Sequence, residues 1–216
     1  MFEQFKVALK KRNISNIIAH DLSAKNFAAK QFSEEIKQAN ALAVFPDGQT
    51  KDGNNSFDKA IDIIDQNDGE KPILGSNTLY LSKSLNRINN KNPKNPLIIS
   101  VDWHPDYPDA KAFANDAYEN YWHGDVNYRT ALAYEATEVL VKVLLKGAKI
   151  KSRLDVKDIL SYNFNESSSV VTGINVRFDD GDTQENRKIF VTPVFNTSSN
   201  ATSKFCIVNS DSCTKW

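Results

Sequence analysis

Residues 126–145 read Val-Asn-Tyr-Arg-Thr-Ala-Leu-Ala-Tyr-Glu-Ala-Thr-Glu-Val-Leu-Val-Lys-Val-Leu-Leu, and this stretch decides the fold. It is rich in alanine, leucine and long charged side chains, and no glycine or proline interrupts it. The sequence therefore predicts a helix over residues 128–145. Because the neighbours at helical spacing are apolar, we expect Tyr134 in the core and Glu135 as a solvated charge.

The bulk composition is that of an ordinary globular protein. The chain has 216 residues, of which 40% are hydrophobic and 25% charged, enough for one large domain or two small ones. Lys+Arg and Asp+Glu balance at 27 each, so no net charge attracts nucleic acid, and no nucleic-acid partner is expected.

Membrane and export signals are missing from the sequence as given. No window approaches the roughly 18 apolar residues that span a bilayer. Residues 1–12 lack the apolar core and the cleavage site of a signal peptide. Taken at face value, the chain would stay in the cytoplasm; the alternative is that it is a piece of a longer exported protein.

The first half of the chain alternates between helical and strand patterns. Residues 41–45 form a continuous apolar run stopped by Pro-Asp-Gly, which is typical of a strand buried in a parallel sheet. The other strand candidates are residues 14–19 and 72–75, and the predicted helices cover residues 27–39, 57–65 and 78–88. This order predicts an α/β fold with a three-layer parallel sheet.

Residues 89–96, Asn-Asn-Lys-Asn-Pro-Lys-Asn-Pro, mark the clearest boundary in the sequence. A strand over 97–101 follows, and then helices over 110–122, 128–145 and 154–160. Two further strand candidates, 173–178 and 188–195, flank the turn Asp-Asp-Gly-Asp at 179–182, which predicts a hairpin.

Several segments, in order, resemble the second half of the type I periplasmic substrate-binding proteins, the Leu/Ile/Val receptor family of ABC transporters. They are Ala41–Gly48, which ends Phe-Pro-Asp-Gly; Pro72–Tyr80; Ile98–His104; the paired helices over 113–122 and 125–145; and the pair 171–174 and 177–182. In that family, two α/β lobes joined by crossing strands close on a small ligand. The resemblance implies one nearly complete lobe plus part of the other.

The resemblance also implies a division of the chain. Residues 1–96 correspond to a second-lobe α/β segment, and residues 97–188 to a crossing strand and helices of a partial first lobe. Residues 189–216 correspond to a return strand and C-terminal tail. Nothing matches the opening half of the first lobe.

The function implied is non-catalytic binding of an amino acid or a related polar solute in an ABC-type uptake system. The partner is then a membrane permease and the location periplasmic or extracytoplasmic. The alternative is an effector-sensing domain fused to a signalling or regulatory segment. The acidic residue that holds the ligand amino group in amino-acid receptors falls near Asn77, whose amide cannot neutralise a buried ammonium, so amino-acid specificity is in question.

Polar residues follow the predicted strands, where open parallel sheets bind ligands. The ligand-binding candidates at these positions are Asp47, Gly48, Ser76, Asn77 and Thr78. The same residue types are favoured in turns and helix caps, which is the structural alternative. Trp103 and His104 lie at the inferred crossing loop. Either Trp103 forms a wall of the ligand site and His104 hydrogen-bonds the ligand, or Trp103 packs at the hinge and His104 lies on the surface.

No motif for an enzyme, a metal or a cofactor is present. The sequence lacks Gly-x-Ser-x-Gly, a P-loop, Gly-x-Gly-x-x-Gly and His-Glu-x-x-His. The Asp-rich run 179–182 lacks the closing Glu of an EF-hand and predicts a turn. An α/β enzyme with an unrecognised site is a further alternative that no sequence feature supports, and a structure with His104 paired with a carboxylate in a deep pocket would favour it. Cys206 and Cys213 are either unrelated thiols or a disulfide closing a short loop.

Overall fold

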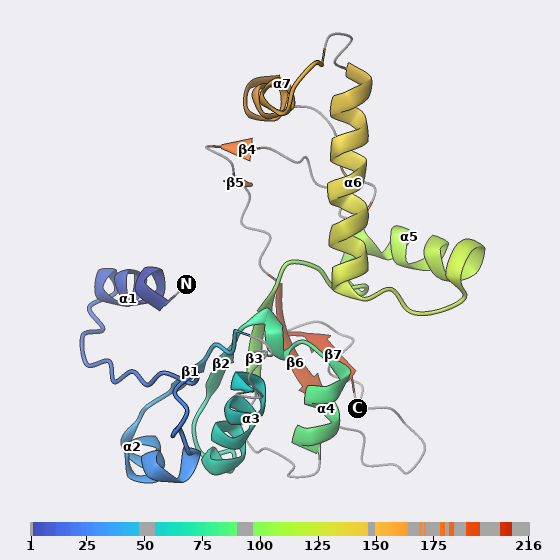
Figure 1. Cartoon of the computed structure of the whole chain (residues 1–216). Helices are drawn as coiled ribbons and strands as arrows, with labels where there is room; N and C mark the ends of the chain where they lie inside the picture. The colour runs from blue at the N-terminus through green and yellow to red at the C-terminus, as the bar shows by residue number, and fades with distance from the viewer. Residues whose placement is uncertain are drawn as a thin grey trace.

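The computed structural model describes residues 2–47, 55–89, 97–146, 150–163, 169, 171, 178–179, 182–183, 189–194 and 204–208. Figure 1 shows two parts with different construction. In the sheet region (residues 29–101 and 189–207), helices pack on a five-stranded sheet. In the helical region (residues 103–163), the long helix α6 (Tyr128–Lys146) extends away from that sheet.

The five strands lie in the order β1-β2-β3-β6-β7. Their bounds are β1 Leu42–Val44, β2 Ile73–Gly75, β3 Leu97–Val101, β6 Ile189–Val194 and β7 Lys204–Ile207. The first three run parallel, whereas β6 is antiparallel to β3 and β7 is antiparallel to β6. The predicted α/β class is confirmed, with the parallel order confined to β1, β2 and β3.

Three helices and one short turn of helix accompany the first strands. They are α1 (Phe2–Lys11), η1 (Ala29–Phe32), α2 (Ser33–Gln38) and α3 (Ser56–Asn67). In α3, Phe57, Ala60, Ile61 and Ile64 are buried at the three- and four-residue spacing of an amphipathic helix. The ring of Phe5 on α1 lies 5.1 Å from that of Phe45, just after β1.

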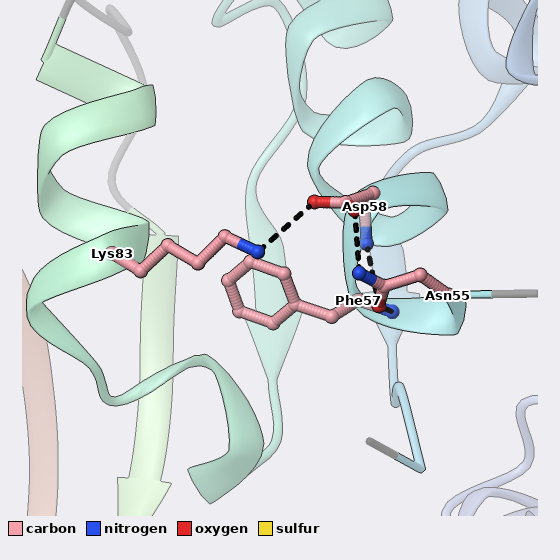
Figure 2. A network of polar contacts seen from close by, with 4 residues as sticks. All are labelled: Asn55, Phe57, Asp58 and Lys83. Atoms are coloured by element: carbon pink, nitrogen blue, oxygen red, sulfur yellow. Dashed lines mark hydrogen bonds and ion pairs between the residues drawn. The ribbon is translucent and has the colours of Figure 1, made fainter. Parts of the chain in front are cut away.

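The start of α3 is fixed by the polar network in Figure 2. The side-chain oxygen of Asn55 accepts hydrogen bonds from the backbone N–H groups of Phe57 (3.1 Å) and Asp58 (3.4 Å), which caps the helix. Lys83, on α4 (Ser82–Asn89), reaches over the Phe57 ring and places its Nζ 3.5 Å from Asp58 Oδ1. The network therefore ties α4 to the first turn of α3.

One apolar core holds the sheet region together. Strands and helices both contribute to it, so the helices pack on the sheet. Its buried residues are Val44, Phe57, Ala60, Ile61, Ile64, Ile73, Leu79, Leu85, Ile88, Leu97, Ile99, Val101, Val191 and Phe205.

The helical region has separate, smaller cores. Its elements are α5 (Pro108–Asp116), which continues as the π-helical η3 (Ala117–Trp122), then α6, α7 (Arg153–Asp158) and η4 (Ile159–Asn163). One core joins Trp103 to the α5, η3 and α6 helices, and a second lies around Val139 and Val143. No helix in the described ranges combines the length and apolarity needed to cross a bilayer.

The structure corrects several predicted elements. Residues 14–19 form no strand, and Ile14 and Ile18 are exposed. The helix predicted over 78–88 is broken into η2 (Asn77–Leu79) and α4, because Tyr80 adopts a non-helical backbone (φ −81°, ψ 68°). Strand β7 was not predicted.

The hairpin prediction is half right. The turn at 179–182 is confirmed, since Asp179 lies opposite Asp182 in the pair β4 (Phe178–Asp179) and β5 (Asp182–Thr183). The strand predicted over 188–195 is confirmed as β6, but its pairing is wrong, because it joins β3 in the main sheet and not the strand before the turn. The strand predicted over 173–177 lies outside the described residues.

The predicted orientation of α6 is wrong. Tyr134 is 45% exposed and Glu135 only 7%. Ala131, Glu135, Val139 and Val143 recur every four residues on the side that faces the rest of the described chain. Because apolar residues occupy both sides of α6, periodicity alone did not decide which side is inward.

Candidate functional site

The carboxyl ends of β1 and β2 meet at one edge of the sheet. The two strands are parallel, with Val44 opposite Gly75, so the residues that follow them emerge side by side. The backbone N–H of Ser76 reaches the carbonyl of Val44 at 3.4 Å and extends this pairing into the loop. The sequence candidates after β1 and after β2 are therefore neighbours.

Asp47 is the charged group at this edge. Its side chain is exposed, and its Oδ1 accepts a hydrogen bond from the hydroxyl of Ser56 at 2.5 Å. Ser56 is fully buried and is the first residue of α3, where the helix dipole also favours a carboxylate. The carboxylate is thus held in place and still reaches solvent. Gly48 lies outside the described residues.

Ser76 carries a buried hydroxyl. The residue is 7% exposed, and its Oγ makes no hydrogen bond to the described part of the chain. A buried hydroxyl left unpaired costs about 1–3 kcal/mol, which is a reason to look for a function. Asn77 and Thr78 follow it in η2 and are half-buried.

Gly75 explains why η2 can fold back on the strand end. A Cβ at position 75 would lie 2.8 Å from Leu79 Cδ1 and 3.3 Å from Leu97 Cδ1. The missing side chain leaves room for Leu79, which is fully buried. This close approach sets the direction of the Ser76–Thr78 segment.

Trp103 and His104 follow β3 and are both buried. Trp103 Nε1 donates to the carbonyl of Val171 at 3.3 Å. His104 Nδ1 accepts the backbone N–H of Asp106 at 3.1 Å, so Nε2 carries the proton and donates to the Phe205 carbonyl at 3.1 Å. Burial lowers the pKa of His104, which keeps the imidazole neutral.

The ring of Tyr80 joins the two regions. Its centroid lies 4.9 Å from that of Phe205 in the sheet region, and 5.5 Å from Tyr128 and 6.1 Å from His104 in the helical region. Burial, with a smaller contribution from Asp106, raises the pKa of its phenol. Sequence reasoning missed both Tyr80 and Ser56, because no spacing rule marks an aromatic at a junction or a serine behind a carboxylate.

The structure places Asp47 after β1, Ser76, Asn77 and Thr78 after the neighbouring parallel strand β2, and Trp103 and His104 after β3, the next strand. The ring nitrogens of Trp103 and His104 already have backbone partners, whereas Asp47 accepts from Ser56 and the Ser76 hydroxyl has no partner among the described residues. Whether any of them binds a ligand remains a prediction. His104 has main-chain partners, so the condition set for the enzyme alternative is not met. The described residues contain no group of three His, Cys, Asp or Glu side chains able to hold a metal.

No family model matches the sequence, and no curated protein matches it significantly. Solved structures do match. A putative branched-chain amino acid ABC transporter protein from Rhodospirillum rubrum superposes with a TM-score of 0.62 at 16% identity, over 90% of this chain and 54% of that one. A leucine-binding protein from Thermotoga maritima superposes with a TM-score of 0.51 at 17% identity, over 84% and 49%.

The chain therefore has the fold of the type I periplasmic substrate-binding proteins, as the sequence predicted. It spans about half the length of these two solved structures. The prediction that only a portion of that fold is present is also confirmed.

Proposed function

We propose that this chain is part of a two-lobed, non-catalytic receptor that binds a small polar solute outside the cytoplasmic membrane and delivers it to an ABC-type permease. The solute is an amino acid or a related compound. One observation carries the proposal: nine-tenths of the chain follows the fold of a branched-chain amino acid transporter protein. The leucine-binding protein from T. maritima supports the solute class.

The lobes divide as the sequence suggested: residues 1–96 belong to the second lobe, 97–188 to the crossing strand and first-lobe helices, and 189–216 to the return strand and tail. The separate apolar cores of the two regions support two lobes, with the crossing strand β3 and the return strand β6 packed in the core of the sheet region. Since Tyr80 contacts both regions, it lies where the lobes turn against each other. A ligand that contacts both lobes favours the closed state.

At the strand edge, we assign ligand contacts to Asp47, Gly48, Ser76, Asn77 and Thr78. The unpaired hydroxyl of Ser76 gains a partner when a polar ligand arrives, which offsets its desolvation. Asp47 supplies the negative charge that Asn77 does not, and its Ser56 hydrogen bond fixes the carboxylate toward a ligand ammonium. Trp103 and His104, whose rings are held by backbone hydrogen bonds, wall the same site.

Thermal-shift screening tests the receptor function. The panel holds leucine, isoleucine, valine, the other L-amino acids and small amides, applied to this chain and to the same chain extended by the upstream coding region. A ligand at about 100 times its Kd stabilises by about 2.7 kcal/mol, or roughly 5–11 °C for a protein of this size. If no compound raises the Tm of either protein, the receptor proposal fails.

Two serines give a matched pair for the site. Ser84 is also buried and also lacks a described hydrogen-bond partner for its hydroxyl, but it belongs to α4 and not to the segment that directly follows β2. Ser76→Ala should abolish the ligand-induced shift, and Ser84→Ala should keep it. If the ligand-induced shift in Tm is the same in the two variants, the assignment of Ser76 to the ligand site is wrong, whereas the fold assignment is unaffected. No observation favours the sensory module or the enzyme, so neither is proposed.

A further inference from the structure

The side of α6 that faces solvent is apolar. We call this the outer face of α6; it consists of Ala133, Tyr134, Thr137, Leu140, Val141, Leu144 and Leu145. Val141 is 46% exposed, Leu144 51% and Leu145 80%. Over the described residues, the whole sheet region exposes one large hydrophobic side chain, Phe190. The apolar exposure of α6 is therefore a local property of the helical region.

Beyond its exposed first-turn residue Arg129, the charges of α6 lie on its other side. Between residues 133 and 145 they are Glu135, Glu138 and Lys142. Glu135 is 7% exposed, and the Glu138–Lys142 pair (2.5 Å) keeps only 12% and 30% of its side-chain surface exposed. A surface helix normally shows the reverse, with charges toward water. A helix with apolar residues on both sides is a buried helix.

The fold indicates which kind of structure would cover the outer face of α6. In α/β proteins, helices bury their apolar stripe against a sheet. The described residues of the helical region contain no strand, and between it and β6 the structure describes only the two-residue strands β4 and β5, whereas the sheet region has five strands. The chain also spans about half of the two solved structures that share its fold.

We propose that the outer face of α6 is a docking surface for the apolar face of a β-sheet contributed by the other half of the two-lobed fold. Strands of parallel sheets are apolar on both faces, so such a sheet matches a surface without a single charge. The inference rests on the fold and on the distribution of charge along α6. It does not depend on the ligand-binding proposal.

The first test uses the chain by itself, with anilinonaphthalene sulfonate as a probe of exposed apolar surface. The variant Val141→Lys/Leu144→Lys should lower dye fluorescence at least twofold, and the Tm should change by less than about 2 °C because both sites are exposed. The control Ala112→Lys/Asn115→Lys adds the same charge at exposed positions on α5 and should leave dye binding unchanged.

Sedimentation of the same proteins separates the alternatives. The proposal expects a monomer. If the chain is a dimer that Val141→Lys/Leu144→Lys dissociates, the outer face of α6 binds a second copy of this chain, and the proposal of a sheet as its partner is wrong. A monomer whose dye binding does not respond to the variant would show that the face is already covered, and would overturn the proposal equally.

The second test supplies the proposed partner. The polypeptide encoded directly upstream is fused to this chain, or co-expressed with it under a separate tag, and hydrogen exchange is measured over residues 133–145. Protection of this segment is expected. In the fused protein Val141→Lys/Leu144→Lys should lower the Tm by about 10 °C or more, because it buries two charges. Unchanged exchange together with an unchanged Tm would refute the docking surface.

Discussion

The sheet region and the helical region bury their apolar residues to very different degrees. In the sheet region the inward side chains of α3 and β3 are almost fully buried, with Ile61 and Ile99 at 0% exposure. In the helical region, α6 is at least as rich in apolar residues, yet Leu144 and Leu145 face solvent. Apolar sequence alone does not make a core, because burial needs a second surface. The second surface is present for one region and absent for part of the other.

The largest expected effect tests this contrast directly. Ile61→Ala removes methyl groups from a filled core and should lower the free energy of unfolding by about 2–5 kcal/mol. Leu144→Ala removes a comparable side chain from a half-exposed position and should change it by no more than about 0.5 kcal/mol. Urea denaturation followed by circular dichroism measures both. If the two variants lose similar free energies of unfolding, Leu144 is buried in solution, and the difference in burial between the two regions is contradicted.

A smaller effect is expected for added rather than removed volume. Gly75→Ala places a methyl group 2.8 Å from Leu79 Cδ1, so the core must shift, at a cost of about 1–3 kcal/mol. Gly124, between η3 and α6, has its nearest neighbour atom at 3.8 Å, so Gly124→Ala should be close to neutral. The same denaturation experiment compares them. A neutral Gly75→Ala would show that the end of β2 is less tightly packed than the structure indicates.

The smallest effect concerns the junction of the two regions and depends on pH. Burial lowers the pKa of His104 in the folded protein below its ordinary value of 6.5. The unfolded chain therefore binds the proton more readily, and the stabilising contribution of neutral His104 is complete above that value and is lost as pH falls. The free energy of unfolding should decline from pH 7.5 toward about pH 5.

Two variants isolate the histidine responsible for this decline. His104→Asn should flatten the decline with falling pH. His123→Asn should preserve it, since His123 is exposed and asparagine tolerates its left-handed backbone (φ 50°). If the two pH profiles coincide, His104 is not the titrating group.

Most of the sheet region could be predicted because its strands and helices are short, uniform in pattern and separated by clear turns. Strand β3 was placed over its observed range, Leu97–Val101. Strand β7 was missed because Lys204–Ile207 has no alternation and is recognised only through its pairing with β6. The orientation of α6 was missed for a physical reason, since both of its sides are apolar and the side that faces the described chain carries Glu135.

The candidate site was predictable in position but not in detail. The rule that ligands bind beyond the carboxyl ends of parallel strands located Asp47 and Ser76. It could not reveal that Ser56 holds the carboxylate, or that the Ser76 hydroxyl has no partner among the residues the structure describes, because both depend on how α3 and η2 return to the sheet. Nor could it reveal that both ring nitrogens of His104 form hydrogen bonds with backbone groups.

The pairing of β3 with β6 has a consequence for protein engineering. Val101 and Ile189 lie directly opposite each other on neighbouring antiparallel strands, so everything between them leaves and re-enters the sheet at a single point. The helical region is thus an inserted cassette. Replacing residues 102–188 by a two-residue Asn-Gly turn would close β3 and β6 into an ordinary hairpin. Every strand pairing of the five-stranded sheet is kept in such a deletion, which makes this junction the natural place to exchange one helical region for another.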